Sequence, residues 1–203
     1  ETLVGDRLGD YVVERNLGEG STAHAFLVRT PEGERAVLKV AKTTEQNARI
    51  RSEGGVLARL RQRAIVELLA EPFDIGDRAT LLLAYADGGD LRHRLLSGDP
   101  LDDETLERWA EDLLEAVEGL ERVAVHHRDI KPENLGVMTV GPGGHEHLVL
   151  LDFSLADAPD DEIYLGTPPY LDPFLGAGGR HLFDEAADRF SAAIVLHEMA
   201  TGT

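Results

Sequence analysis

The run His127-Arg128-Asp129-Ile130-Lys131-Pro132-Glu133-Asn134 places a carboxylate, an ammonium group and an amide within a few residues of one another. A carboxylate such as Asp129 can accept the proton of an attacking hydroxyl group. Lys131 can neutralise a phosphoryl group as it moves, and the amide of Asn134 can hold a magnesium ion. The run therefore predicts phosphoryl transfer. The plain alternative, a solvated charged loop, has to explain why further phosphate-binding patterns occur in order around it.

One such pattern is the glycine-rich segment Gly18-Glu19-Gly20-Ser21-Thr22-Ala23, which joins strand-like stretches at residues 11–17 and 25–29. Only glycine lets backbone N–H groups approach phosphate oxygens that closely. A hairpin turn is the commoner explanation of two nearby glycines, so the segment indicates a phosphate site only in the company of the other motifs.

Two more motifs complete the pattern. Ala36-Val37-Leu38-Lys39 reads as a strand that ends on a lysine, and Leu151-Asp152-Phe153-Ser154 places an aspartate after the catalytic run. Lysine occurs only at positions 39, 42 and 131, so the strand motif and the catalytic run hold two of the three lysines in the chain. Taken in order, the segments resemble the glycine-rich loop, lysine strand, catalytic loop and magnesium motif of protein kinases, over residues 11–202.

The resemblance implies ATP and Mg²⁺ as cofactors. It implies that Asp129 and Lys131 are catalytic, together with an ion pair between Lys39 and the helical Glu53. Glu45 is the rival partner of Lys39, but it lies too early in the helix. The chain after this helix, at residues 65–68, reads as the next strand.

The remaining site residues are also implied by the resemblance. The magnesium ligands are expected to be Asn134 and Asp152. Leu83 is expected beside the adenine. The backbone of Ala84 and Ala86 is expected to hydrogen-bond the base, and Asp90 is expected at the ribose. The full set expected to contact the nucleotide is Leu17, Gly18, Gly20, Ser21, Ala25, Val37, Lys39, Leu83, Ala84, Ala86 and Asp90.

Gly54 and Gly55 directly follow Glu53, although each glycine destabilises a helix interior by roughly 1 kcal/mol relative to alanine. Two interpretations stay open. Small residues can simply allow close packing, or a weakened helix can make the pair between Lys39 and Glu53 conditional.

The second half of the chain is expected to be mainly helical. Thr80–Tyr85 reads as a buried strand, and from Leu101 a long helix begins with Asp102 or Asp103 as its N-cap. Its expected apolar stripe consists of Leu106, Trp109, Leu113, Leu114, Val117 and Leu120.

Two short strands, at residues 135–139 and 147–151, are expected on either side of the turn sequence Gly141-Pro142-Gly143-Gly144. We expect the adjacent His145-Glu146-His147 to be solvated, and we assign no transition metal.

The segment Gly166–Phe174 resembles the peptide-docking loop of serine/threonine kinases. Lys131 together with Thr167 is the serine/threonine pairing in that family. Asp172-Pro173-Phe174 stands where the family usually has Ala-Pro-Glu, so the family's glutamate is absent. Asp188 opens a segment that resembles the central helix of the large lobe, where the corresponding aspartate braces the catalytic loop.

Arg128 is placed where kinases often bind a phosphorylated residue that orders the activation segment, here residues 152–174. The loop has few hydroxyl residues, with Tyr164 as its only ordinary phosphorylation site. We expect a carboxylate to replace the phosphate, although a charge run on a surface is usually just solvated. The candidates are Asp157, Asp160, Asp161 and Glu162.

The composition fits a soluble globular domain, with 203 residues, 42% hydrophobic and 29% charged, and no stretch of membrane-spanning length. A net charge of −18 argues against nucleic acid or anionic membrane as direct ligands. It favours a basic protein substrate, although an acidic solvated surface is the commoner explanation of such a charge. The absence of cysteine permits a cytoplasmic location.

The expected fold is α+β and bilobal. A small antiparallel β lobe with one helix and the hinge occupies residues 1–87, and a mainly helical large lobe, truncated after its central helix, occupies residues 88–203. We expect the chain to be part of a longer protein with other domains. Gly166–Leu175 and His197–Gly202 resemble the large bacterial kinases of phage-growth-limitation and BREX-type antiviral systems.

The expected activity is phosphorylation of serine or threonine on a protein. The runner-up is a pseudokinase that binds a nucleotide or a partner without catalysis. It is favoured by three departures from the family pattern, namely Ala23, Ser154 and Gly136. A purely structural adaptor would not need Asp129, Lys131, Asn134 and Asp152 together.

Overall fold

The computed structural model describes residues 2–98, 100–141 and 144–202. The chain forms two compact units. The first comprises the residues up to Arg59 together with Val66–Tyr85, and the second comprises Leu60–Ile65 and the residues from Ala86 on. The first unit is rich in β-structure and the second is mainly helical, which confirms the expected α+β class.

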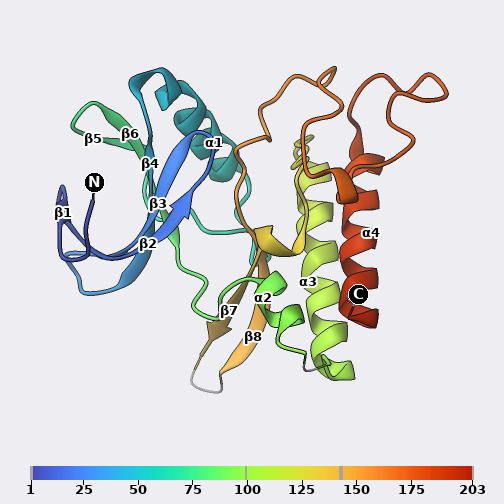
Figure 1. Cartoon of the computed structure of the whole chain (residues 1–203), viewed down its shortest axis with the longest axis horizontal. Coiled ribbons are helices and arrows are strands. Elements are labelled where there is room, and N and C mark those ends of the chain that lie inside the picture. The colour runs from blue at the N-terminus through green and yellow to red at the C-terminus, as the bar shows by residue number, and fades with distance from the viewer. Residues whose placement is uncertain (1, 99, 142–143, 203) are drawn as a thin grey trace. The chain divides into compact units, whose positions relative to one another are not determined.

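A six-stranded antiparallel sheet forms the first unit, in the order β1-β2-β3-β4-β6-β5 (Figure 1). Its strands are β1 (Arg7–Leu8), β2 (Tyr11–Glu19), β3 (Ala23–Arg29), β4 (Arg35–Ala41), β5 (Phe73–Ile75) and β6 (Arg78–Ala84). Neighbouring strands in this order are joined mostly by short turns. Phe26 and Val28 of β3 pair with Leu38 and Ala36 of β4, and these four buried residues give the sheet an apolar face. That face contributes a core of Val13, Phe26, Val28, Ala36, Leu38 and Leu82.

One α-helix, α1 (Asn47–Arg59), accompanies this sheet and follows the short 3₁₀ helix η1 (Thr44–Gln46). Its buried side includes Ile50, Val56 and Leu57, which recur at helical spacing. The predicted strand at residues 65–68 is wrong. The segment forms only two isolated bridges, Ile65 with Leu150 and Leu68 with Leu83. The reason is that the chain passes from the second unit to the first between Ile65 and Val66.

Among its described residues, the second unit contains three α-helices, α2 (Leu91–Leu96), α3 (Asp103–Arg122) and α4 (Glu185–Thr201). Asp102 is the N-cap of α3, because its carboxylate accepts a hydrogen bond of 2.7 Å from the backbone N–H of Thr105. Helices α3 and α4 lie side by side (Figure 1). The predicted apolar stripe of α3 is right except at Leu114, which is 54% exposed and therefore faces solvent.

A two-stranded hairpin, β7 (Leu135–Val140) and β8 (His145–Leu150), packs against α3. Pro142 and Gly143 of the predicted turn lie outside the described residues. The expectation that His147 is solvated is wrong. Its side chain is on the buried face of β8, and burial lowers its pKa.

Within the described part of the chain, none of the helices has both the length and the apolar character needed to span a bilayer.

Candidate phosphoryl-transfer site

Helix α4 holds the backbone of the catalytic run through Asp188. Both carboxylate oxygens of Asp188 accept backbone hydrogen bonds, from the N–H of His127 at 2.7 Å and of Arg128 at 2.9 Å. Asp188 is almost completely buried, so these bonds satisfy a charge that would otherwise be costly. Arg128 has a positive φ of 70°, a strained conformation that a non-glycine residue keeps only when its surroundings enforce it. The predicted brace is confirmed.

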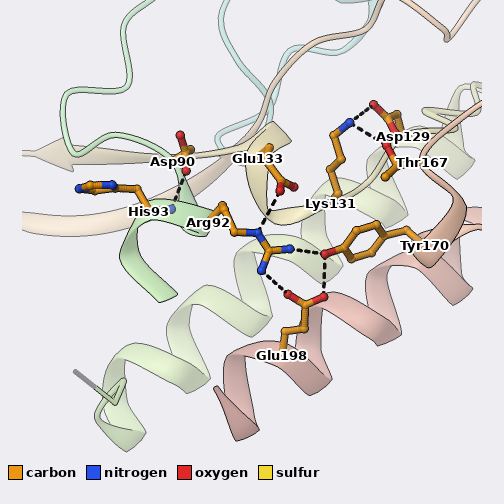
Figure 2. Close-up of polar contacts among 9 residues, drawn as sticks. All are labelled: Asp90, Arg92, His93, Asp129, Lys131, Glu133, Thr167, Tyr170 and Glu198. Carbon is orange, nitrogen blue, oxygen red and sulfur yellow. Dashed lines mark hydrogen bonds and ion pairs between the residues drawn. The ribbon is translucent and has the colours of Figure 1, made fainter. Parts of the chain in front are cut away.

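Asp129, Lys131 and Thr167 form a closed triangle (Figure 2). The Thr167 hydroxyl donates to Asp129 Oδ1 at 2.6 Å, and Lys131 Nζ donates to Thr167 Oγ1 at 2.7 Å. Lys131 Nζ also lies 2.7 Å from Asp129 Oδ2. The docking loop therefore reaches the catalytic run directly, and it does so at the carboxylate that was predicted to act as the base.

Asn134 completes this cluster. It ends the 3₁₀ helix η2 (Pro132–Asn134), and its Nδ2 donates to the backbone oxygen of Asp129 at 2.8 Å and to Oδ2 at 3.0 Å. Both bonds use the amide nitrogen, so the oxygen, which is the atom able to ligate a hard cation, lies on the other side of the group.

Asp152 lies close to Asn134 because of the hairpin register. Leu135 pairs with Leu150, and the next bond of this ladder joins the N–H of Leu151 to the carbonyl of Asn134 at 2.8 Å. Asp152 is the next residue after Leu151, is exposed and has a φ of 56°. An amide oxygen and a carboxylate at one end of a hairpin fit Mg²⁺, which takes few protein ligands and completes its shell with phosphate and water.

In the first unit, the predicted pair between Lys39 and Glu53 is present at 2.7 Å. Lys39 lies on β4 and Glu53 on α1, and their side chains are only 12% and 2% exposed. An ion pair this well shielded is stronger than a surface pair, because little water screens it. Glu45, the rival, lies in η1 and is exposed.

The two glycines after Glu53 differ in their surroundings. A Cβ on Gly54 would lie 2.4 Å from Cγ of Pro72 and 2.8 Å from Cδ2 of Leu81, whereas a Cβ on Gly55 would meet open space. Gly54 is therefore required for close packing of α1 on the chain around β6. This supports the packing explanation at Gly54 and leaves the conditional helix as a hypothesis for Gly55 alone.

The glycine-rich loop joins β2 to β3 and is closed by its own bonds. The N–H of Gly18 donates to Asn16 Oδ1 at 2.8 Å, and the N–H of Gly20 donates to the carbonyl of Ala23 at 2.9 Å. The side chain of Gln46 ties the loop to η1 through the carbonyl of Ser21 at 3.1 Å. Gly18 and Gly20 therefore use their N–H groups inside the loop.

Four of the expected nucleotide residues share one face of the sheet. Ala25 pairs with Lys39, and Val37 pairs with Leu83. Directly paired residues of an antiparallel sheet point to the same side, as do residues two apart along a strand. The N–H of Ala84 donates to the carbonyl of Glu67 at 2.9 Å, so it is not a free donor for a base. Leu17 lies near the end of β2, just before the glycine-rich loop, and is 38% exposed.

The other two, Ala86 and Asp90, belong to the second unit. The carboxylate of Asp90 accepts from the N–H of His93 at 2.7 Å and so caps α2. A Cβ on Gly136 would lie 2.6 Å from Cβ of Ala86, so glycine at 136 is what allows the segment before α2 to approach β7.

The sequence did not reveal the cluster around Arg92. This guanidinium contacts Glu133 at 2.9 Å, Glu198 at 2.9 Å and the hydroxyl of Tyr170 (Figure 2). Tyr170 also donates to Glu198 at 2.7 Å. Burial, followed by the bond to Glu198, raises the pKa of Tyr170 to about 12. The cluster joins α2, η2, the docking loop and α4, and no local spacing links these residues.

Arg128 meets one of the predicted carboxylates. Its guanidinium donates to Asp160 at 2.6 Å and to the carbonyl of Ala158 at 2.9 Å, and it stacks 4.6 Å from the ring centre of Phe183. The Arg128 side chain is 1% exposed, and this burial lowers its pKa. Asp160 is therefore the acid that pairs with Arg128.

Comparisons with known proteins agree with this arrangement. The probable kinase PglW of Streptomyces coelicolor is 37% identical over 230 residues, which cover 100% of this chain and 15% of PglW. CBL-interacting serine/threonine-protein kinase 24 of Arabidopsis thaliana is 31% identical over 97% of the chain and 45% of its own length. Calcium/calmodulin-dependent protein kinase type IV of the mouse is 30% identical over 97% and 42%.

The chain thus spans less than half the length of each of these relatives. The model of the family described as "Protein kinase domain" matches residues 11–203, nearly the whole chain. With the catalytic run, the magnesium motif and the sheet in the expected order, the chain belongs to the protein kinase domain family.

Proposed function

We propose that this chain transfers the γ-phosphoryl group of ATP, with Mg²⁺, to serine or threonine on a protein. The observation that carries the proposal is the closed triangle of Asp129, Lys131 and Thr167. It joins a carboxylate base, a cation and the docking loop in one hydrogen-bonded group, and Lys131 with Thr167 is the serine/threonine pairing.

In this mechanism the acceptor hydroxyl displaces the hydroxyl of Thr167 or shares Asp129 with it. As the acceptor oxygen bonds to the γ-phosphorus, its proton passes to the Asp129 carboxylate and the bond to the β-phosphate oxygen breaks, releasing ADP. Lys131 Nζ stabilises the charge on the transferred group, and Asn134 keeps the Asp129 carboxylate in its orientation. Mg²⁺, held by Asn134 and Asp152, would neutralise phosphate charge.

The first unit contributes the nucleotide side of the proposal. Glu53 holds Lys39 at 2.7 Å, which orients the ammonium group for the α- and β-phosphates. The shared sheet face of Ala25, Val37 and Leu83 is the proposed adenine wall. The proposed functional lobes are residues 1–87 and 88–203, although Leu60–Ile65 belong to the second compact unit.

The test uses the full-length protein, γ-labelled ATP and Mg²⁺, with myelin basic protein as a basic acceptor. Label that depends on Mg²⁺ and is recovered as phosphoserine or phosphothreonine after acid hydrolysis is expected. Label recovered only as phosphotyrosine would contradict the assignment of the acceptor, and absence of transfer by nucleotide-loaded protein would contradict catalysis.

A nucleotide-binding module without transfer is the second candidate, and the glycine-rich loop favours it. Ala23 is fixed in β3 by pairing with Ala41, and the N–H groups of Gly18 and Gly20 are already used. In this candidate, the adenine and ribose contacts would retain ATP, but the loop would not hold the γ-phosphate in place for transfer. Calorimetric titration with ATP and Mg²⁺ separates the candidates when compared with the labelling assay, because the module binds ATP but labels no protein.

The biological setting is also a proposal. The similarity to the probable kinase PglW, together with the low coverage of that protein, supports a kinase part of a longer bacterial protein. The resemblance of Gly166–Leu175 and His197–Gly202 to kinases of antiviral systems is the reason to propose that it acts in the cytoplasm in antiviral defence. The encoding gene should reduce phage plaque formation in a sensitive host, and the same gene carrying Asp129→Asn should not. Equal protection by both would argue against a role for phosphoryl transfer in defence.

A further inference from the structure

The segment that follows the docking loop is cross-linked by an arginine between two aspartates. Arg180 contacts Asp172 at 2.5 Å through one nitrogen and Asp184 at 2.6 Å and 3.2 Å through the two others. The Asp172 side chain is only 4% exposed. A planar guanidinium can serve two carboxylates at once, which an ammonium group cannot do with the same geometry.

The chain between these residues is folded so that Arg180 can reach both. The N–H of Gly176 donates to the carbonyl of Arg180 at 2.7 Å, and the N–H of Arg180 donates to Ala177 at 3.0 Å. Gly176, Gly178 and Gly179 have φ values of 82°, 61° and 88°, which side chains other than glycine rarely adopt. The result is a tight turn that returns Arg180 to the start of the segment.

On one side, this ion-paired group holds the end of the docking loop. Asp172 Oδ1 accepts from the N–H of Phe174 at 2.9 Å, directly after the 3₁₀ helix η3 (Pro168–Tyr170). Two residues before Asp172 in the same loop, the carbonyl of Tyr170 accepts from the buried Ser191 hydroxyl of α4 at 2.7 Å. Near the start of the loop, the hydroxyl of Thr167 donates to Asp129.

On the other side, the group is joined to the helix that fixes the catalytic run. Asp184 is the N-cap of α4 and accepts from the N–H of Ala187 at 3.2 Å. One turn later, Asp188 accepts from the backbone of His127 and Arg128. The contacts therefore form a continuous path from the docking loop through Arg180 and α4 to the catalytic run.

We propose that Arg180, bridging Asp172 and Asp184, is a positioning residue that holds the docking loop, Gly166–Phe174, on α4 so that a protein acceptor can bind beside Asp129. The proposal rests on the proposed kinase function and adds a residue that the motifs do not include. Arg180 acts through the loop and does not touch the substrate. The position of the family's glutamate is occupied by Phe174, which is 65% exposed, so Asp172 supplies the loop's acidic contact instead.

The test compares three variants of the full-length protein with wild type. Asp172→Asn removes the charge of the ion pair but keeps an oxygen for the N–H of Phe174, so it isolates the contact to Arg180. Arg180→Lys keeps the charge but can serve only one carboxylate. Arg122→Ala is the matched control, because it breaks a pair with Glu118 of similar length, 2.7 Å, in which both side chains are exposed.

Two readouts separate positioning from a general loss of stability. The KM for myelin basic protein should rise by about fivefold or more in Asp172→Asn and by less in Arg180→Lys, with the KM for ATP changed by less than about twofold. Backbone amides of the docking loop should exchange hydrogen faster in Asp172→Asn, while amides of α3 keep their wild-type rate. Arg122→Ala should match wild type in both.

The proposal is overturned if Asp172→Asn has the wild-type KM for the acceptor, or if its docking loop exchanges hydrogen at the wild-type rate. It is also overturned if the variant loses ATP binding and α3 protection together, because that is general destabilisation. If wild type transfers no phosphate, the proposed kinase function fails. Hydrogen exchange still decides then whether Arg180 holds the loop, since it needs no turnover.

Discussion

At the scale of single residues, the buried guanidinium of Arg128 supports the hypothesis that the activation segment, residues 152–174, is ordered without phosphorylation. It is paired with Asp160 at 2.6 Å, while its Nε and one terminal nitrogen are buried without a hydrogen-bond partner among the described atoms. A desolvated cation with one carboxylate partner depends strongly on that partner, because the charge would otherwise be uncompensated. Asp160 is thus well placed to replace a phosphate.

We therefore predict that Asp160→Asn lowers the phosphorylation rate by about tenfold, by analogy with loss of a partner of a buried charge. Asp161→Asn is the matched control, since it removes the same charge from the exposed neighbouring residue. Initial rates with γ-labelled ATP measure the effect. Treatment with a phosphatase, or the substitution Tyr164→Phe, should leave the wild-type rate unchanged, and a rate that falls after either would rule out Asp160 as the ordering group.

The sequence predicted the contact partner of a residue correctly where that residue lies inside a short motif. Glu53 as the partner of Lys39, and an acid of residues 157–162 as the partner of Arg128, are both found as expected. Arg92 was not foreseen, because its partners come from three distant segments and no periodic spacing joins them. Arg180 was missed for a related reason, since a turn of several glycines, and not a helix, brings it to Asp172.

At the scale of elements, α1 separates the effects of two adjacent glycines. Gly55→Ala should stabilise the protein by roughly 1 kcal/mol, because the helix gains propensity and the new methyl group meets open space. Gly54→Ala should destabilise it by about 1–3 kcal/mol, because the methyl group would overlap the ring of Pro72. Urea unfolding of both variants measures the two free energies, each serving as the control for the other.

The same pair tests whether the helix gates activity. If ordering of α1 makes the contact between Lys39 and Glu53 conditional, Gly55→Ala should also raise the basal phosphorylation rate. A stabilised variant with an unchanged rate would end the gating hypothesis, and stabilisation by Gly54→Ala would contradict the packing explanation.

Helices and strands were predictable where the apolar spacing and the capping residues indicated the same element. The N-cap Asp102 and the apolar spacing defined α3, although Leu114 lies outside the buried stripe. The apolar run at residues 65–68 looks the same as a strand in sequence, but only tertiary contacts determine that it forms single bridges. His147 is buried because β8 packs on α3, which the two neighbouring polar residues concealed.

At the scale of the whole molecule, the two compact units hold different parts of the proposed chemistry. The first contains the glycine-rich loop and the pair between Lys39 and Glu53, and the second contains Asp129, Asn134 and the docking loop. The net charge of −18 agrees with the proposal that the acceptors are basic proteins. The fold class followed from the order of the motifs, whereas the contacts that hold the docking loop required the structure.

The central claim is that Asp129 is the base in phosphoryl transfer, and its most direct test is the initial rate of label transfer from γ-labelled ATP to myelin basic protein by the full-length protein. We predict that Asp129→Asn, which keeps the size of the side chain and can still bond to Asn134 and Thr167, lowers this rate by at least roughly 10²-fold. Its unfolding midpoint in urea should stay near that of wild type. Equal rates for wild type and Asp129→Asn would show that Asp129 is not the base.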